Sequence, residues 1–586
     1  MRTWRASVRL EVLLYTVLIV IAVGLRFSKL DWPPLTEAEA TQALAALEST
    51  PQASPFWSEP SELARSNVSY QVFTYWILQI TGPADSGARL ISALAGLGLV
   101  LAPLLLRRKL GAAATFATCL LLAISPVSIA AARTAGSGAL AALWLAVAFG
   151  LGAKATDRRQ RLLALASLGL AFTCGPSVFT GLLGWALGAA AVSAWPPARA
   201  DERPIGPRLM EFARDLWMVP LVMLIVAGGL RLSLAGVGDL FQGLAVWFRD
   251  WASGGGVPAL TELAALPIYE PLVLIFGIFG LGSALRRRDR LGMGAIWFAI
   301  GALLIVVMRS GRSPEDLIWV VMPLALLGGR ATSAVVEKVR DSGPWEVVTA
   351  LFSSVVVLAV FAYIQVATYA QGLGNLAYEN AWVLPVLALA ALGLAGMLMV
   401  FFGLNWSWRL ALGTAGCAVF VVATALSLSA AWHISLGPKA ASSQELWRPQ
   451  ATTQGIRQLV EILESTALAS FGRKDELELR VEGELPSSVA WALDGFRPET
   501  TRLWQDQDQV PAILLPENAE DPKLEADYMG QTVTLGERWG WQGALPPDPV
   551  AWWITRRAPT LQDRWLVLIR ADIATLGQYE LPATTD

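Results

Sequence analysis

The stretch Val12–Glu48, VLLYTVLIVIAVGLRFSKLDWPPLTEAEATQALAALE, joins an apolar run to a short polar segment. Its first part, Val12–Leu25, has the composition of a membrane span, and Arg residues precede it without a signal-peptidase site after it, which predicts an uncleaved anchor. The second part places two carboxylates, Glu37 and Glu39, in a loop that enters a short amphipathic helix. An acidic pair is costly near hydrocarbon and invites a chemical explanation, but Glu at a helix start also complements the helix dipole. This stretch alone leaves both explanations open.

The composition is that of an integral membrane protein. Of its 586 residues 54% are hydrophobic and 16% are charged, whereas a soluble domain averages about 25% charged residues. Cys119, Cys174 and Cys417 lie far apart in apolar segments, which argues against a disulfide framework and a thiolate metal site. The chain has a single histidine, His433, which argues against a histidine-based metal site or a catalytic triad. The sequence also has no Walker loop and no dinucleotide fingerprint, which argues against an ATP-driven or nicotinamide-dependent protein. We expect no metal site, no cofactor and no nucleic-acid partner.

Basic clusters fall at every second boundary between apolar runs, of which about thirteen recur from Val12 to Ala431. These clusters are Arg107–Lys109, Lys154–Arg161, Arg199–Arg214, Arg286–Arg290, Arg330–Arg340 and Arg409. By the positive-inside rule they face the cytoplasm together with the N-terminus, and the loop that holds Glu37 and Glu39 faces outside. Four further segments are expected outside, namely those around Arg133, Val237–Tyr269, Arg309–Arg312 and Ala367–Ala381.

The part of the chain from His433 to Asp586 is predicted to be a separate unit, and an odd number of preceding spans places it outside. Alternating apolar residues predict strands in Leu477–Val481, Ala512–Leu515 and Arg564–Asp572, and helical spacing predicts a helix over Thr453–Leu468. We therefore expect an all-α membrane bundle over residues 1–432, with a first outer loop at 28–69, and an extracytoplasmic α/β domain over 433–586. The tryptophans of this second domain could stack on sugars, build its core or anchor it at the bilayer surface.

Several blocks stand in a fixed order along the chain. They are Pro34-Leu-Thr-Glu37-Ala38-Glu39-Ala40 followed by Ala43 and Ala46, the stretch Tyr70–Gly111 with SGARLISALAG and a basic end, Ser125-Pro126 through Arg133, and the tail segments Val489–Phe496 and Ala551–Ile573. Together these blocks resemble the multi-spanning GT-C glycosyltransferases that use polyprenyl-phosphate sugars, a superfamily that includes protein O-mannosyltransferases and the aminoarabinose transferase of lipid A. The tail is similar to that of an uncharacterised bacterial and archaeal subgroup.

The resemblance implies a multi-pass protein of the cell membrane that transfers a sugar, with inversion, from a lipid-linked donor to a hydroxyl of a glycan, lipid or protein acceptor. It makes Glu39, with Glu37 as the substitute, the carboxylate that accepts the proton of that hydroxyl. Arginines at the outer boundaries are candidates for the donor phosphate, because a guanidinium matches phosphate oxygens in geometry and charge. These arginines are Arg89, Arg133, Arg309 and Arg312.

Three positions depart from the family pattern and remove charge from the implied site. Ala38 stands where the family has Asp, the segment up to Ser137 lacks an Asp that many members carry after the arginine, and Cys174 replaces a common Lys. The alternative function is therefore a catalytically degenerate relative that serves as an accessory or scaffold in lipid-linked oligosaccharide export. A secondary transporter would predict inverted repeats and charges buried within the spans, and the sequence shows neither clearly.

Overall fold

The structure is a computed structural model. It describes residues 2–47, 66–194, 205–229, 235–252, 254, 256–287, 289–340, 343–372, 382–501, 510–519, 524 and 526–577. Residues 48–65 of the predicted first outer loop and residues 195–204, which include the start of the third basic cluster, lie outside the described residues.

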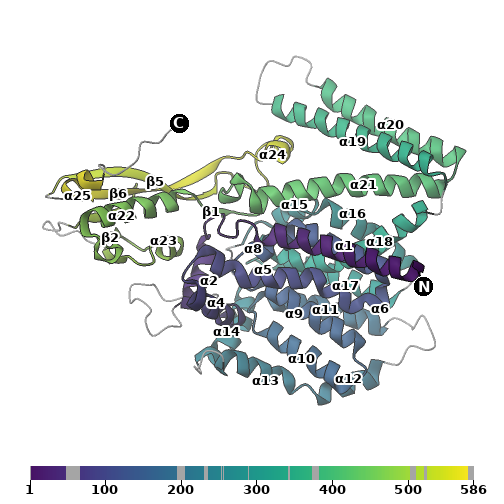
Figure 1. Cartoon of the computed structure of the whole chain (residues 1–586), viewed down its shortest axis with the longest axis horizontal. Coiled ribbons are helices and arrows are strands. Elements are labelled where there is room, and N and C mark those ends of the chain that lie inside the picture. The colour runs from purple at the N-terminus through teal and green to yellow at the C-terminus, as the bar shows by residue number, and fades with distance from the viewer. Residues whose placement is uncertain are drawn as a thin grey trace.

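The N-terminal three quarters of the chain form a bundle of apolar helices (Figure 1). Its longer helices are α1 (Arg2–Phe27), α2 (Glu37–Leu47), α4 (Val68–Thr81), α5 (Asp85–Leu101), α7 (Ala112–Ile124), α8 (Pro126–Arg133), α9 (Gly138–Lys154), α10 (Arg158–Phe172), α11 (Ser177–Ala194), α12 (Ile205–Arg214), α13 (Met218–Leu224), α14 (Ala235–Arg249), α15 (Ala259–Tyr269), α16 (Pro271–Arg287), α17 (Arg290–Met308), α18 (Ile318–Arg340), α19 (Trp345–Gly372), α20 (Val383–Asn405) and α21 (Trp408–Ala431). Short turns of helix include α6 (Arg107–Leu110) and the 3-10 turn η3 (Pro314–Leu317).

Many of these helices are long and apolar enough to cross a bilayer. Within the described residues eight helices qualify, or up to ten if each of two bent pairs counts as one span, and two shorter apolar helices add to them. Large apolar side chains such as Leu389, Met397 and Leu404 of α20 lie exposed, as expected for a surface in contact with lipid. The predicted polytopic membrane bundle is confirmed, while the count of about thirteen spans stays a prediction.

Two bent helix pairs meet at their breaks. Helices α7 and α8 are bent by 58° and α15 and α16 by 91°. A proline begins the second helix of each pair, Pro126 in α8 and Pro271 in α16, and the residue before a proline is held out of the helical conformation. The Glu270 carboxylate, which sits at the second break, accepts the Ser125 hydroxyl at 2.5 Å and the Val127 amide at 2.8 Å at the first. This carboxylate therefore holds the two breaks together.

The basic clusters gather at one end of the bundle. Arg107 pairs with Glu11 of α1 at 2.7 Å, Arg161 pairs with Glu211 of α12 at 2.7 Å, and Arg330 pairs with Asp289. In Figure 1 the N-terminus, α6 and α12 lie at the end opposite α2. The alternation predicted from the sequence thus corresponds to two ends of the bundle, and the side of the membrane that each end faces stays a prediction.

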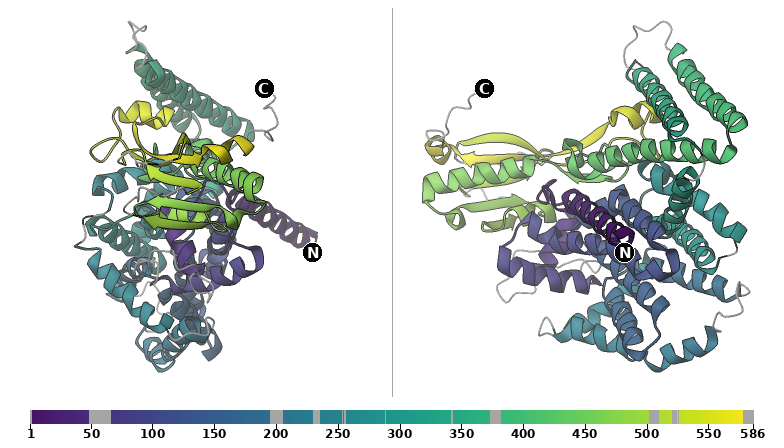
Figure 2. Two further views of the ribbon diagram at one scale, coloured as in Figure 1. Left: turned by 90° about the vertical axis from the view of Figure 1, so that its left-hand side faces the viewer. Right: turned by 45° about the vertical axis from the view of Figure 1, so that its right-hand side comes forward.

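The C-terminal part contains one mixed six-stranded sheet in the order β1-β5-β6-β4-β2-β3. Its elements are β1 (Gln450–Thr452), α22 (Gly455–Phe471), β2 (Glu478–Glu482), α23 (Ser487–Ala492), β3 (Arg497–Thr501), β4 (Ala512–Pro516), β5 (Tyr528–Trp539), α24 (Pro549–Thr555), β6 (Thr560–Arg570) and α25 (Ala571–Gly577). Strand β2 pairs in parallel with β3 and β4, and the other pairs are antiparallel. The right-hand view of Figure 2 shows this sheet domain projecting beyond the helices.

Alternation along the strands divides their side chains between two faces. Leu479, Ala512, Leu514 and Val567 pack on one face with helix α22, whereas Ile513 and Leu515 face the opposite cluster. The three predicted strands and the predicted helix lie in β2, β4, β6 and α22. Of the tryptophans, Trp491, Trp552 and Trp565 are buried and belong to packed clusters.

Candidate active site between the first loop and the sheet domain

Glu39 takes part in the start of helix α2. The Thr36 amide and hydroxyl donate to Glu39 Oε2 at 3.0 and 3.1 Å, and the Glu39 amide approaches the Thr36 hydroxyl at 3.4 Å. This reciprocal pattern is a capping box, in which the residue before the helix and the third helical residue satisfy each other's amides. The sequence T-x-x-E at Thr36–Glu39 therefore fixes where the chain turns into the helix.

The same carboxylate forms a buried ion pair with Arg89 of α5. Arg89 Nε donates to Glu39 Oε1 and Arg89 Nη2 to Glu39 Oε2, each at 2.8 Å, and the Ala135 amide donates to Oε1 at 2.9 Å. Burial raises the pKa of Glu39, but the Arg89 charge and hydrogen bonds outweigh burial and lower this pKa from 4.5 to about 2. Both oxygens of Glu39 are thus occupied by donors, and the carboxylate stays ionised at neutral pH.

Arg89 and Arg133 bind the backbone of the first loop. Besides Glu39, Arg89 donates to the carbonyls of Leu30 at 3.2 Å and Pro33 at 2.5 Å. Four carbonyls accept from the Arg133 guanidinium, those of Arg26, Ser28, Lys29 and Trp32, at 2.7 to 3.2 Å. The structure brings these two predicted phosphate-binding arginines to the Glu39 loop, but their terminal nitrogens hold the loop's carbonyls.

Arg309 and Arg312 lie in the turn after α17 and have partners of their own. Arg309 forms an ion pair with Asp316, and both side chains are buried. Arg312 donates to the Val257 carbonyl at 2.7 Å and to the Val306 carbonyl at 3.3 Å. These contacts fasten the turn at 309–316 to the segment before α15, so the two predicted outer segments meet.

Glu37 faces away from Glu39 and contacts the sheet domain. On a helix two residues apart diverge by about 200°. The Glu37 carboxylate accepts the amides of Ser487 at 2.6 Å and Ser488 at 3.0 Å, at the start of α23. Glu37 and Glu39 therefore act at different places, one on the sheet domain and one on Arg89.

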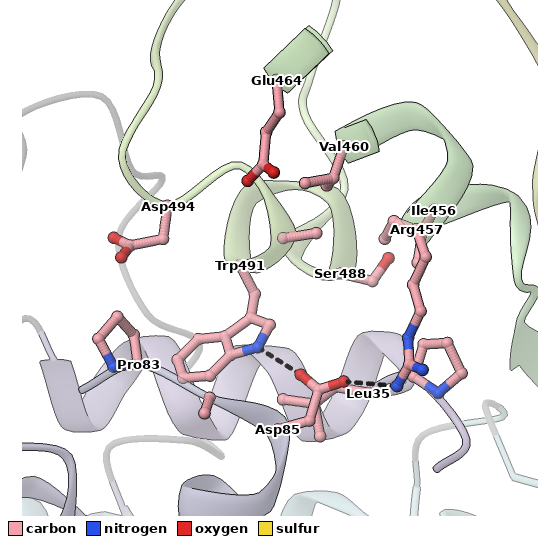
Figure 3. A pocket seen from close by; sticks show the side chains of 13 residues that line it. Leu35, Pro83, Asp85, Ile456, Arg457, Val460, Glu464, Ser488, Trp491 and Asp494 are labelled. Carbon is pink, nitrogen blue, oxygen red and sulfur yellow. Dashed lines mark hydrogen bonds and ion pairs between the residues drawn. The ribbon is translucent and has the colours of Figure 1, made fainter. Parts of the chain in front are cut away.

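A cavity of about 320 Å³ lies beside this contact, between the first loop and helices α22 and α23 (Figure 3). Trp491 of α23 donates its indole N–H to Asp85 at 2.8 Å, and Arg457 of α22 approaches the same carboxylate at 3.8 Å. The Arg457 guanidinium also donates to the Asp31 carbonyl at 2.5 Å and lies over the Trp32 ring. The sheet domain thus contacts the loop that carries Glu39 at Asp31 and Trp32 and contacts α5 at Asp85.

Two charged residues that the sequence analysis did not select lie near Glu39. Glu315, in η3, and Arg448, just before β1, each interact electrostatically with Glu39 and with each other. Burial lowers the pKa of Arg448 to about 10, so this guanidinium is charged at neutral pH. Glu315 could have been noticed in the sequence, because it is a carboxylate just before an apolar run. Nothing in the local sequence singles out Arg448.

The described residues contain no group of three or more His, Cys, Asp or Glu side chains placed to hold a metal ion. The charged groups that the loop, α5, η3 and the segment before β1 bring together are carboxylates and guanidinium ions. This set can orient an anion and accept a proton.

No protein-family model matches the chain, and the search of curated proteins finds no match. Among solved structures, the chain is similar to ArnT from Cupriavidus metallidurans bound to undecaprenyl phosphate, with a TM-score of 0.55 and 15% identity over 95% of this chain and 98% of that one. The apo state of that ArnT gives a TM-score of 0.50 and 16% identity over 84% of this chain and 86% of that one. A likeness at this identity concerns the fold, and it agrees with the resemblance of the sequence blocks. The chain therefore shares the fold of this ArnT.

Proposed function

We propose that this protein is a membrane glycosyltransferase that transfers a sugar from a polyprenyl-phosphate carrier to an acceptor hydroxyl at the outer face of the cytoplasmic membrane. The observation that carries the proposal is the buried Glu39–Arg89 pair, which fixes the first loop at the end of a GT-C bundle beside further cationic groups. The similar ArnT structure was solved with undecaprenyl phosphate bound, which supports a lipid phosphate as the donor carrier here.

Transfer from a lipid phosphate requires a group that accepts the proton of the attacking hydroxyl and cations that stabilise the departing phosphate. The resemblance of the sequence implies Glu39, or Glu37 in its place, as the group that accepts this proton. A carboxylate with a pKa of about 2 binds a proton weakly at neutral pH, so Glu39 suits the organisation of the loop better than proton transfer.

Deletion and complementation test this function. In a strain that lacks the protein, we expect the polyprenyl-phosphate sugar to accumulate and one surface glycan to lose a sugar, both measured by mass spectrometry. Complementation with the wild-type chain is expected to restore both. An unchanged pool of lipid-linked sugars together with unchanged surface glycans would contradict the proposal.

The accessory function in lipid-linked oligosaccharide export is a second candidate. The observation that favours it is that Glu39, Arg89, Arg133, Arg309 and Arg312 all have partners within the chain. In that case the deletion strain would accumulate the complete oligosaccharide on its lipid carrier and would retain each single-sugar donor at its normal level. The same mass spectra therefore separate the two functions.

A further inference from the structure

The groups that handle a donor and an acceptor must have free hydrogen-bonding capacity. Glu39 does not, because its two oxygens accept from Arg89, Thr36 and the Ala135 amide. Arg89 and Arg133 are likewise committed to carboxylate and carbonyl oxygens. Among the described residues, the charged groups that interact with Glu39 and have no such commitments are Glu315 and Arg448.

Arg448 offers an uncommitted guanidinium from a rigid segment. Its side chain has no hydrogen bond or ion pair among the described residues, and it is half-buried. The backbone just before it is anchored, since Tyr269 donates its hydroxyl to Glu445 at 2.8 Å and accepts the Trp447 amide at 3.3 Å. Pro449 follows and restricts Arg448 to an extended backbone conformation. A cation on such a support can be aimed at a ligand with little loss of conformational freedom.

Glu315 has a carboxylate without such commitments, and it interacts electrostatically with Arg448. Its neighbour Asp316 is engaged by Arg309 and by the Ser313 amide, whereas the Glu315 carboxylate has no hydrogen bond or ion pair in the part of the chain that the structure describes. Gly138, the first residue of α9, faces it, and a Cβ atom there would lie 4.0 Å from Glu315 Oε2. Adjacent carboxylates therefore differ in role: Asp316 fastens the turn, and Glu315, beside Gly138, interacts electrostatically with Glu39 and Arg448.

We infer that Arg448 holds the phosphate of the lipid-linked donor and that Glu315 accepts the proton of the acceptor hydroxyl. The inference rests on the proposed glycosyl transfer. The acceptor oxygen forms a bond to the anomeric carbon while the bond from this carbon to the phosphate oxygen breaks. The electron pair of the broken bond leaves with the polyprenyl phosphate, whose added charge Arg448 stabilises, and the hydroxyl proton passes to the Glu315 carboxylate.

Lipid binding tests the role of Arg448. The wild-type protein and Arg448→Gln are purified in detergent and titrated with undecaprenyl phosphate by native mass spectrometry. We expect binding to weaken by about tenfold or more in Arg448→Gln, because a charge-assisted contact to the phosphate is lost. Arg473→Gln, which removes an exposed guanidinium from the sheet domain, is the matched control and should bind like the wild type. Arg448→Lys, which keeps the charge, should recover part of the binding.

Donor turnover tests the role of Glu315. Glu315→Gln is expected to bind undecaprenyl phosphate like the wild type but to slow sugar transfer by about 10²-fold or more, seen as accumulation of the lipid-linked sugar in complemented cells. Glu461→Gln, an exposed change on α22, is the control and should restore the wild-type pool. Melting temperatures confirm that the compared variants are folded, and Glu315→Asp should retain part of the transfer.

Two results would overturn the inference. One is wild-type binding by Arg448→Gln, and the other is full restoration of the glycan by Glu315→Gln. A failure of the proposed function itself looks different, because then the wild-type chain would neither bind undecaprenyl phosphate nor alter the pool of lipid-linked sugars.

Discussion

At the scale of single residues, Glu39 combines the cap of α2 with a buried ion pair. Removing one partner of a buried pair leaves the other charge uncompensated, which costs about 3–5 kcal/mol. We therefore expect Glu39→Gln to lower the free energy of unfolding by that order, because Arg89 loses its only hydrogen-bonded carboxylate in the described residues. Thermal unfolding in detergent measures the change, and Glu461→Gln on the surface of α22 is the control.

Acid distinguishes this structural role from a general loss of packing. The folded-state pKa of Glu39 is about 2, below its ordinary value of 4.5, so its stabilisation is complete above pH 4.5 and is lost as the pH falls toward 2. The difference in stability between wild type and Glu39→Gln should therefore shrink over that interval. A variant that melts like the wild type at pH 7 would show that Glu39 does not support the loop.

Part of this site could be selected from the sequence, and the part that could not has a physical reason. The order Thr36-x-x-Glu39 contains a local capping signal, and the sequence analysis selected Arg89 and Arg133, which the structure places at the loop. The sequence could not show that these arginines bind carbonyls, because that depends on contacts between residues 50 to about 100 positions apart. Arg448 escaped notice for the same reason, since more than 400 residues separate it from Glu39.

At the scale of elements, the joint between α2 and α23 couples the first loop to the sheet domain. The Glu37 carboxylate binds the first two amides of α23, and Asp85 accepts from Trp491. Removing the Glu37 acceptor with Glu37→Ala and the Trp491 donor with Trp491→Phe should raise hydrogen exchange at Ser487 and Ser488 by about tenfold or more, because each lost charge-assisted bond is worth about 1.5–3 kcal/mol.

The control for this joint is Glu461→Ala, which removes an exposed carboxylate from α22 and touches none of these contacts. The strands β2, β4 and β6 should keep their slow exchange in the double variant, because their pairing does not depend on the loop. Unchanged exchange at the two amides would mean that other contacts, such as Arg457 on Asp31, hold the domain in place.

Elements differed in how well the sequence predicted them. Alternation located β2, β4 and β6, and helical spacing located α22, because each pattern follows from the element's own geometry. The bends between α7 and α8 and between α15 and α16 were not predicted. Proline marks both positions, but the angle of each bend is set by packing against other helices, and the Glu270 contact that joins the breaks spans more than 140 residues.

At the scale of the whole molecule, the charges divide the bundle into two ends. Ion pairs connect the basic clusters at one end, and the first loop contacts the sheet domain at the other. The positive-inside rule then predicts that the sheet domain lies outside the cell. A cysteine introduced at exposed Gln458 of α22 should react with a membrane-impermeant maleimide in intact cells, and one at exposed Arg108 of α6 should react only after the membrane is opened.

The chain offers its own background control for this labelling. Cys119 and Cys174 are buried and Cys417 is only partly exposed, so the protein without an added cysteine should give a weak signal in intact cells. Both added cysteines replace exposed side chains, so equal labelling of the two after permeabilisation confirms that each is reachable. Labelling at position 108 but not at position 458 in intact cells would show that the orientation in the membrane is the opposite of the predicted one. The first loop and Arg448 would then face the cytoplasm, where nucleotide sugars are present, and this result would contradict the proposed transfer at the outer face of the membrane.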